Sequence, residues 1–191
     1  MPHTIVISLL RGINVGGNHL IRMDAVKAVF QSVGLEEPRT YLQSGNVVYR
    51  TAERDLERIG LRLEAAIEQG YGFRPAIIQR TLPDFRRAVA SNPFTAPLYP
   101  ELDPSKLVVT FLSAEPHPAA GPKLKSAYAG PERMVLLGRE LFIYFPEGQG
   151  KSKIPATLID KTLRVPGTGR NWNTVTKLLE MAESLESERT A

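Results

Sequence analysis

Amide, hydroxyl and cationic side chains gather in four short stretches of the sequence that are rich in glycine and asparagine. The stretches are residues 11–18 (RGINVGGN), 43–46 (QSGN), 148–153 (GQGKSK) and 168–173 (TGRNWN). None of them contains an aspartate or a glutamate. Cations held close together without carboxylates repel one another, and a bound anion offsets that repulsion. The four stretches are therefore typical of loops that bind a phosphate, a carboxylate or a nucleotide.

The first two stretches supply several candidate ligand-binding residues. These are Arg11, Asn14, Gly16, Gly17, Gln43, Ser44 and Asn46. An arginine directly after an apolar strand can hold a phosphate with two N–H groups, or it can pair with an acidic neighbour. Glycines ahead of a helix can present backbone N–H groups to an anion, but a tight turn needs them as well. The polar side chains of residues 43–46 can contact a planar polar ligand or satisfy their own turn.

The last two stretches supply the candidates Lys151, Ser152, Lys153, Arg170, Asn171 and Trp172. A helix predicted over residues 152–161 would place the two lysines and the serine at a helix N-terminus, where a phosphate is stabilised. This stretch is not a Walker A loop, because Phe145 stands where the first glycine of that motif belongs. Asn171 is typical of a helix N-cap. Trp172 is typical of a core residue or of a surface on which a base stacks.

The residues of common catalytic and metal sites are sparse. Cysteine is absent, and His3, His19 and His117 are far apart in the sequence. No histidines or carboxylates have the spacing of a metal site, and Leu42 replaces the first glycine of a nucleophile elbow around Ser44. The sequence therefore identifies no catalytic residue, no cofactor and no metal site, and it leaves open whether the protein is an enzyme.

Apolar periodicity predicts the elements that position these loops. In the first half we expect strands over residues 4–10, 39–43, 47–50 and 75–79, helices over 26–33 and 56–67, and a short helix opening at Thr81. In the second half we expect strands over residues 106–112, 134–137, 141–145 and 164–166, helices over 122–128 and 152–161, and a last helix over 175–185. Both halves have the order β-α-β-β-α-β. The sequence thus predicts an α+β fold of two ferredoxin-like (β-α-β-β-α-β) halves in tandem with a C-terminal helix.

Prolines mark the boundary between the halves. Pro93, Pro97, Pro100 and Pro104 interrupt the segment between the two sets of elements, and such a segment is typical of a linker. We therefore expect an N-terminal half over residues 1–91, a Pro-rich linker over 92–105, and a C-terminal half with the terminal helix over 106–191.

The predicted topology places some of the loops side by side. In a β-α-β-β-α-β unit the first two strands are parallel, because a helix returns the chain between them. The end of the first strand and the turn after the second strand then lie at one edge of the sheet. We expect residues 11–18 to lie beside residues 43–46 and, in the second half, residues 151–153 to lie near residues 170–172. The sequence leaves open whether the two sets of loops share one pocket.

The charge of the chain is unevenly distributed. The formal net charge is +4, but the C-terminus carries Glu180, Glu183, Glu186 and Glu188 against Arg189, so the remaining chain is more basic than the total. A basic body favours an anionic partner, although no lysine- and arginine-rich arm is present. The apolar residues 5–10 are too few for a signal peptide or a membrane span. We expect a cytoplasmic protein with no membrane partner.

The loops also carry a resemblance to a known family. Residues 9–17 (LLRGINVGG), 41–47 (YLQSGNV), 148–153 (GQGKSK) and 170–175 (RNWNTV) resemble the motifs of the bacterial family known as domain of unknown function 1697. The resemblance extends over nearly the whole chain and supports both the fold and the choice of loop residues. The family's description implies no activity.

These observations lead to two hypotheses about function. The first is that the protein binds a small anionic ligand, phosphorylated or nucleotide-like, in a cleft between the two halves, and an enzyme could act there by positioning and electrostatic stabilisation. The alternative is a nucleic-acid-binding module, since ferredoxin-like sheets with basic edges resemble RNA-recognition folds. Against the alternative, no predicted strand carries the aromatic signature of such folds. The oligomeric state is left open.

Overall fold

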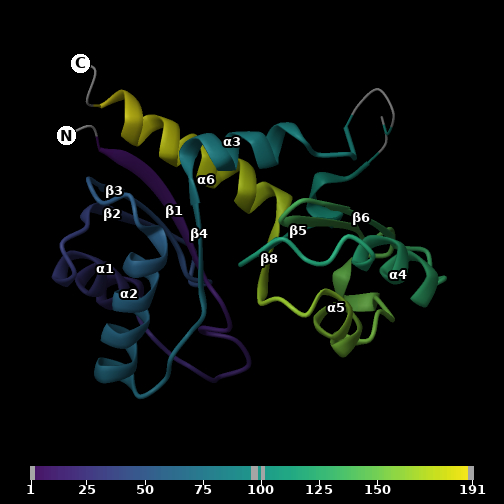
Figure 1. The fold of residues 1–191 in the computed structure, drawn as a ribbon, viewed down its shortest axis with the longest axis horizontal. Helices are drawn as coiled ribbons and strands as arrows, with labels where there is room; N and C mark the ends of the chain where they lie inside the picture. Colours follow the sequence, from purple (N-terminus) through teal and green to yellow (C-terminus); the bar gives the residue numbers. More distant parts are fainter. Residues whose placement is uncertain (1–2, 96–98, 100–101, 189–191) are drawn as a thin grey trace. The chain divides into compact units, whose positions relative to one another are not determined.

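The computed structural model describes residues 3–95, 99 and 102–188 (Figure 1). The chain divides into two compact units, one of Met1–Arg87 with Lys177–Ala191 and the other of Ala88–Thr176. Part of the predicted linker, residues 96–98, 100 and 101, lies outside the described residues. The predicted domain boundaries stay a prediction, and the residues from Lys177 onward, which the sequence assigned to the second half, belong to the first compact unit.

The first unit is built on a four-stranded antiparallel sheet with the strand order β2-β3-β1-β4. Its elements are β1 (Thr4–Leu10), α1 (Met23–Ser32), β2 (Glu36–Tyr41), β3 (Asn46–Thr51), α2 (Leu56–Tyr71) and β4 (Ile77–Thr81). Ile59, Leu63 and Ile67 form the buried stripe of α2 and pack with Phe30 of α1 and Tyr49 of β3. The helices α1 and α2 therefore cover one face of this sheet (Figure 1).

The second unit repeats this architecture with the strand order β6-β7-β5-β8. Its elements are β5 (Leu107–Leu112), α4 (Ala120–Ala127), β6 (Arg133–Leu137), β7 (Glu140–Tyr144), α5 (Ala156–Leu163) and β8 (Gly167–Asn171), with short 3₁₀ turns at Pro104–Lys106 and Gln149–Lys151. Leu124 of α4 and Leu163 of α5 pack with Leu112 and Ile143 of the sheet. The predicted α+β class is confirmed as two four-stranded antiparallel sheets with helices.

Each fourth strand continues directly into a helix, β4 into α3 (Leu82–Ala90) and β8 into α6 (Trp172–Ser187). Arg80 and Arg170 occupy matching positions, because Arg80 pairs with Ile7 of β1 and Arg170 with Val109 of β5. The two sheets thus share their strand order, their antiparallel pairing and the buried arginine of their fourth strand.

Two predicted elements of the second unit have different bounds in the structure. The helix expected over residues 152–161 begins only at Ala156, because Pro155 holds an extended conformation immediately before it and a proline disfavours helical geometry in the residue that precedes it. The strand expected over residues 164–166 begins only at Gly167, and Arg164 is instead the C-cap of α5, with a left-handed backbone of φ 57°.

The glycines and asparagines of the stretch 168–173 indicated a loop. The structure shows instead that these residues belong to the strand β8 and to the beginning of α6. Tertiary pairing with β5 explains the difference. A Cβ at Gly167 would lie 2.7 Å from Leu112 Cδ2 and 2.9 Å from Thr110 Cγ2. Glycine is thus required here because the neighbouring strand comes close, and not because the backbone turns.

The C-terminal part of α6 is joined to the first unit by polar contacts. Arg86 of α3 lies 2.9 Å from Glu183 and 2.8 Å from Glu186. Arg50 of β3, only 6% exposed, donates a hydrogen bond to the carbonyl of Leu185 and lies 3.1 Å from Glu37 Oε1. Exposed ion pairs contribute little, so the buried guanidinium of Arg50 is the important anchor.

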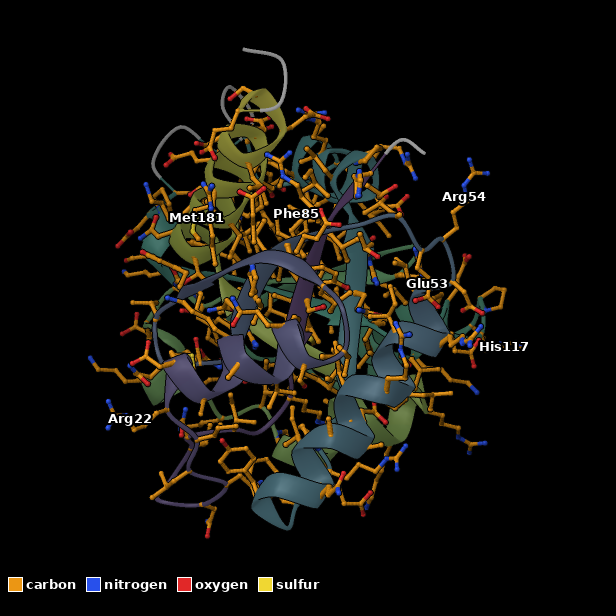
Figure 2. All side chains as sticks on the ribbon, turned by 90° about the vertical axis from the view of Figure 1, so that its left-hand side faces the viewer. Arg22, Glu53, Arg54, Phe85, His117 and Met181 are labelled. Atoms are coloured by element: carbon orange, nitrogen blue, oxygen red, sulfur yellow. The ribbon has the colours of Figure 1, made fainter. Side chains whose placement is uncertain are left out.

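We expect Arg50→Ala to lower the free energy of unfolding by about 3 kcal/mol, because it leaves a buried carbonyl and a carboxylate without their cation. The matched control is Arg54→Ala, whose side chain projects into solvent (Figure 2) and whose loss should change stability by less than about 0.5 kcal/mol. Urea unfolding followed by circular dichroism measures both. Equal effects of the two substitutions would contradict the anchoring role of Arg50.

Candidate functional site

Asn14 joins the first two motif loops at the end of β1. Its Nδ2 donates hydrogen bonds to the carbonyl oxygen of Gln43 at 2.7 Å and to that of Ile21 at 2.9 Å. Its Oδ1 accepts the N–H of Ile21 at 2.9 Å, and the N–H of Leu10 donates to the carbonyl of Gly45 at 2.8 Å. The predicted neighbourhood of residues 11–18 and 43–46 is confirmed.

The same contacts engage the polar groups that the sequence offered for a ligand. The carboxamide of Asn14 bonds to backbone on both sides. Asn46 is fully buried, and its Nδ2 donates to the carbonyl of Tyr41 at 2.9 Å and to Ser44 Oγ at 3.0 Å. These two asparagines hold the loop and the turn together, which leaves Gln43 as an exposed side chain of this turn.

Gly16 and Gly17 lie at the tip of a small hairpin and not directly ahead of a helix. The N–H of Asn18 donates to the carbonyl of Val15 at 3.0 Å, and the two glycines have φ of 59° and 78°. Positive φ at both central residues is what a type I′ turn requires. Because α1 begins only at Met23, the partial positive charge of its N-terminus does not lie beside the N–H groups of these exposed glycines.

Arg11 begins this loop and is half-buried, and its backbone N–H donates to the carbonyl of Ala76 at 2.9 Å. His19, further along the loop, stacks on Phe73 with ring centroids 4.6 Å apart. The segment before β4 therefore forms a third side of this loop cluster, which the sequence did not indicate.

In the second unit a carboxylate occupies the loop around Ser152. Ser152 Oγ donates to Glu132 Oε1 at 2.5 Å, and the Tyr128 hydroxyl donates to Glu132 Oε2 at 2.7 Å. Burial opposes ionisation of Glu132, but the hydrogen bonds from Ser152 and Tyr128 outweigh it and lower the pKa of this carboxyl group. The loop thus binds an anion of its own chain, although the stretch 148–153 contains no acidic residue.

Lys151 and Lys153 flank this serine as exposed side chains, and neither lies in a helix N-terminus. The predicted neighbourhood of residues 151–153 and residues 170–172 stays a prediction. Lys106 Nζ donates to the carbonyl of Pro146 at 2.8 Å, and Asn171 Nδ2 donates to the carbonyl of Ser105 at 2.5 Å. Pro146, which follows β7, and Asn171, at the end of β8, therefore both lie beside residues 105 and 106.

Arg170 and its neighbours serve the junction of β8 and α6. Arg170 is 7% exposed, and its Nη1 donates to Thr168 Oγ1 at 2.7 Å and to the carbonyl of Gly169 at 2.8 Å. Burial lowers the pKa of Arg170 to about 10, so the guanidinium stays charged at neutral pH. Asn171 Oδ1 accepts the N–H of Asn173 at 3.0 Å, as expected of an N-cap, and Trp172 is half-buried at the start of the helix.

Sequence reasoning missed a groove of about 710 Å³ in the second unit, between α4 and α5. The junctions β5–α4 and α5–β8 lie at the same edge of the sheet, because Leu112 pairs with Gly167 and the N–H of Ser113 donates to the carbonyl of Pro166 at 2.8 Å. The helix α4 therefore begins where α5 ends, and the two helices lie side by side (Figure 1).

The charged residues of this groove are mostly basic. Lys123 projects from α4, Lys161 comes from the last turn of α5, and Arg164 follows that helix, whereas Glu115 is the one carboxylate of the lining. Within the described part of the chain, none of the three cations makes an ion pair or a side-chain hydrogen bond. Three cations therefore line one groove together with a single carboxylate.

His117 adds a hydrogen-bond donor at the start of α4. Its Nδ1 lies 3.1 Å from the backbone N–H of Ala119 and accepts a hydrogen bond from it. In the neutral ring the proton is then on Nε2, which becomes a donor. The ring is exposed at the surface of the molecule (Figure 2). The spacing of Ala120, Lys123 and Ser126 along one helical face is the signal that could have indicated the groove.

Among the described residues, no group of three or more histidines, aspartates and glutamates could hold a metal ion. In the described part of the chain, no helix combines the length and the apolarity needed to cross a lipid bilayer.

Removing the carboxylate of Glu132 tests whether it stabilises the loop around Ser152. Glu132→Ala leaves the hydroxyls of Ser152 and Tyr128 without their acceptor, and we expect it to lower the free energy of unfolding by about 1–2 kcal/mol at pH 7. The exposed Glu147 provides the control, with an expected change below about 0.5 kcal/mol.

The pH dependence of this difference gives a second readout. Because the folded state lowers the pKa of Glu132, its contribution is complete above the pKa of the unfolded state, about 4.3. The contribution is lost as the pH falls through the lower pKa of the folded state. Thermal unfolding of the unsubstituted protein and of Glu132→Ala, measured from pH 7 down to a pH below the pKa of the folded state, gives the difference in stability at each pH. A difference that grows as the pH falls would contradict the stabilising role of the ionised Glu132.

Comparison with known proteins agrees with these observations. No curated protein matches the chain. Among solved structures, the conserved bacterial protein SP0830 from Streptococcus pneumoniae is similar, with a TM-score of 0.71 and 24% identity over 95% of this chain and 99% of that one. The similarity supports the fold. The model of the family described as "Protein of unknown function (DUF1697)" matches residues 3–142, and the chain therefore belongs to this family.

Proposed function

We propose that the protein binds a small anionic ligand, phosphorylated or nucleotide-like, and that the groove between α4 and α5 is the binding site. We further propose that each unit is a ferredoxin-like domain, which the shared element order and strand order support. The single observation that carries the functional proposal is the set of Lys123, Lys161 and Arg164 in one groove without carboxylate partners among the described residues.

The electrostatics of the groove support this choice over the motif loops. In the loops, Ser152 is hydrogen-bonded to Glu132, and Arg170 is buried with hydrogen bonds to its own strand. The groove, in contrast, offers ammonium and guanidinium groups whose hydrogen-bond donors are available. Hydrogen bonds between such groups and a phosphate are the strong, charge-assisted kind.

The size of the groove is also suitable. Its volume of about 710 Å³ lies within the range of about 300–1,000 Å³ that is usual for small-molecule sites. A site of this size accommodates a mononucleotide or a phosphorylated metabolite.

The test measures binding of inorganic phosphate, sulfate and AMP by thermal shift and by isothermal titration calorimetry. Lys123→Gln should weaken binding of the ligand that binds best by about tenfold, roughly 1.4 kcal/mol, because it removes one charge-assisted hydrogen bond. Lys125→Gln is the matched control, since Lys125 is an exposed residue of the same helix outside the groove lining. Failure of all anions to bind, or equal losses in the two variants, would refute the proposed site.

Salt dependence separates a small anion from the nucleic-acid alternative. A ligand held by two or three charges should lose about tenfold or less in affinity between about 50 and 200 mM salt, whereas a polynucleotide held by 6–10 phosphate contacts loses about 10³–10⁵. Titrations of AMP and of a single-stranded oligonucleotide at several salt concentrations measure the two slopes. Tight oligonucleotide binding with a steep slope, unaffected by Lys123→Gln, would favour the alternative.

A further inference from the structure

Resting on the proposed function, we propose that the groove between α4 and α5 selects a phosphate monoester with an apolar or planar body, and that Arg164 is a ligand-binding residue held in place for this role. Inorganic phosphate, polyphosphates and phosphodiesters are then poorer ligands. The charge of the groove, its apolar floor and the backbone of Arg164 carry the inference.

The charge of the groove matches a dianion. Lys123, Lys161 and Arg164 supply three positive charges and Glu115 one negative charge, which gives these four residues a formal net charge of +2. A phosphate monoester carries about −1.5 to −2 charges at pH 7. A phosphodiester carries one negative charge and a triphosphate about four, so the charge of neither ligand equals that of the groove.

The floor of the groove is apolar. Ala127 is exposed and Val165 is half-buried, so their carbon atoms are accessible in the groove, and the buried Pro116, Ala120 and Leu163 complete the carbon-rich part of the lining. A bound inorganic anion would leave this apolar surface exposed to solvent. A ligand with a ring or a hydrocarbon body covers it and gains the free energy of apolar burial.

Arg164 has a backbone conformation that an arginine rarely adopts. It has φ 57° at the C-cap of α5, where its N–H donates to the carbonyl of Asp160 at 3.0 Å. Helices commonly end on glycine at such a position, because other residues in this conformation are strained by about 1–2 kcal/mol. Such an outlier is a reason to suspect function. The strained backbone places the guanidinium of Arg164 in the groove. This guanidinium is exposed and has no carboxylate partner among the described residues.

Topology places the cations around a common space. Glu115 and His117 lie in the segment that precedes α4, beside the end of α5 where Arg164 stands. Lys123 lies one helical turn further along α4, and Lys161 one turn back along α5. A phosphate between the two helices can thus meet cations from both walls, and the body of the ligand can lie on Ala127 and Val165.

A set of small phosphates tests the ligand class by calorimetry. Phenyl phosphate and methyl phosphate carry the same dianion and differ in their apolar body, whereas methyl phenyl phosphate keeps the ring and loses one charge. We expect phenyl phosphate to bind about tenfold more tightly than either of the others, because each lacks one of the two matched features.

The substitution Arg164→Gly tests the role of Arg164. Glycine relieves the backbone, so the melting temperature should stay the same or rise, while the affinity for phenyl phosphate should fall about tenfold. A merely structural arginine at the helix end predicts a lower melting temperature and unchanged affinity. Lys125→Gln again serves as the control, with both quantities unchanged.

The outcomes separate the two proposals. If no phosphate compound binds, both the proposed function and the ligand class fail. If all three esters bind equally and Lys123→Gln weakens each of them, the anion site stands and the choice of a monoester with an apolar body is wrong. If Arg164→Gly lowers the melting temperature and leaves affinity unchanged, Arg164 is a structural residue.

Discussion

Burial of the central strands on both faces is the constraint on which the rest of the structure depends. The residues from Ile5 to Leu10 of β1 are all buried, and in β5 only Thr110 is partly exposed. A strand of this kind needs packed side chains on both sides, so the centre of each sheet offers no open face to a ligand. Polar chemistry is restricted to the ends of the strands and to grooves between the covering helices.

At the strand ends, the polar side chains mostly satisfy their own backbone. Buried N–H and C=O groups are costly without partners, and a loop that leaves a buried strand exposes several of them at once. The carboxamide of Asn14 and the N-cap of Asn171 meet this need, and the carboxylate of Glu132 does the same for the hydroxyl of Ser152. Loops rich in asparagine and serine therefore look alike whether they bind a ligand or stabilise themselves.

The groove between α4 and α5 differs from the loops because Glu115 balances only part of the charge of its three cations, which make no ion pair among the described residues. Three cations near one another raise the free energy of the folded state, and the left-handed backbone of Arg164 raises it further. Strain and repulsion of this kind are more common at functional sites than elsewhere. A bound dianion would remove the repulsion, which links the stability of the second unit to occupancy of its groove.

The sequence by itself determined the order of the elements, the apolar strand β1, the two loops joined by Asn14 and the N-cap Asn171, because these depend on local periodicity and on short-range hydrogen bonds. Only the tertiary structure decided that Gly167 to Asn171 form a strand, since β5 supplies the partner and leaves no room for a Cβ at Gly167. It also decided the partner of Ser152, which comes from Glu132, and the groove, whose lining extends from Glu115 to Val165. Such contacts join residues that are far apart in the chain, so they cannot be predicted from the spacing of residues within any one segment.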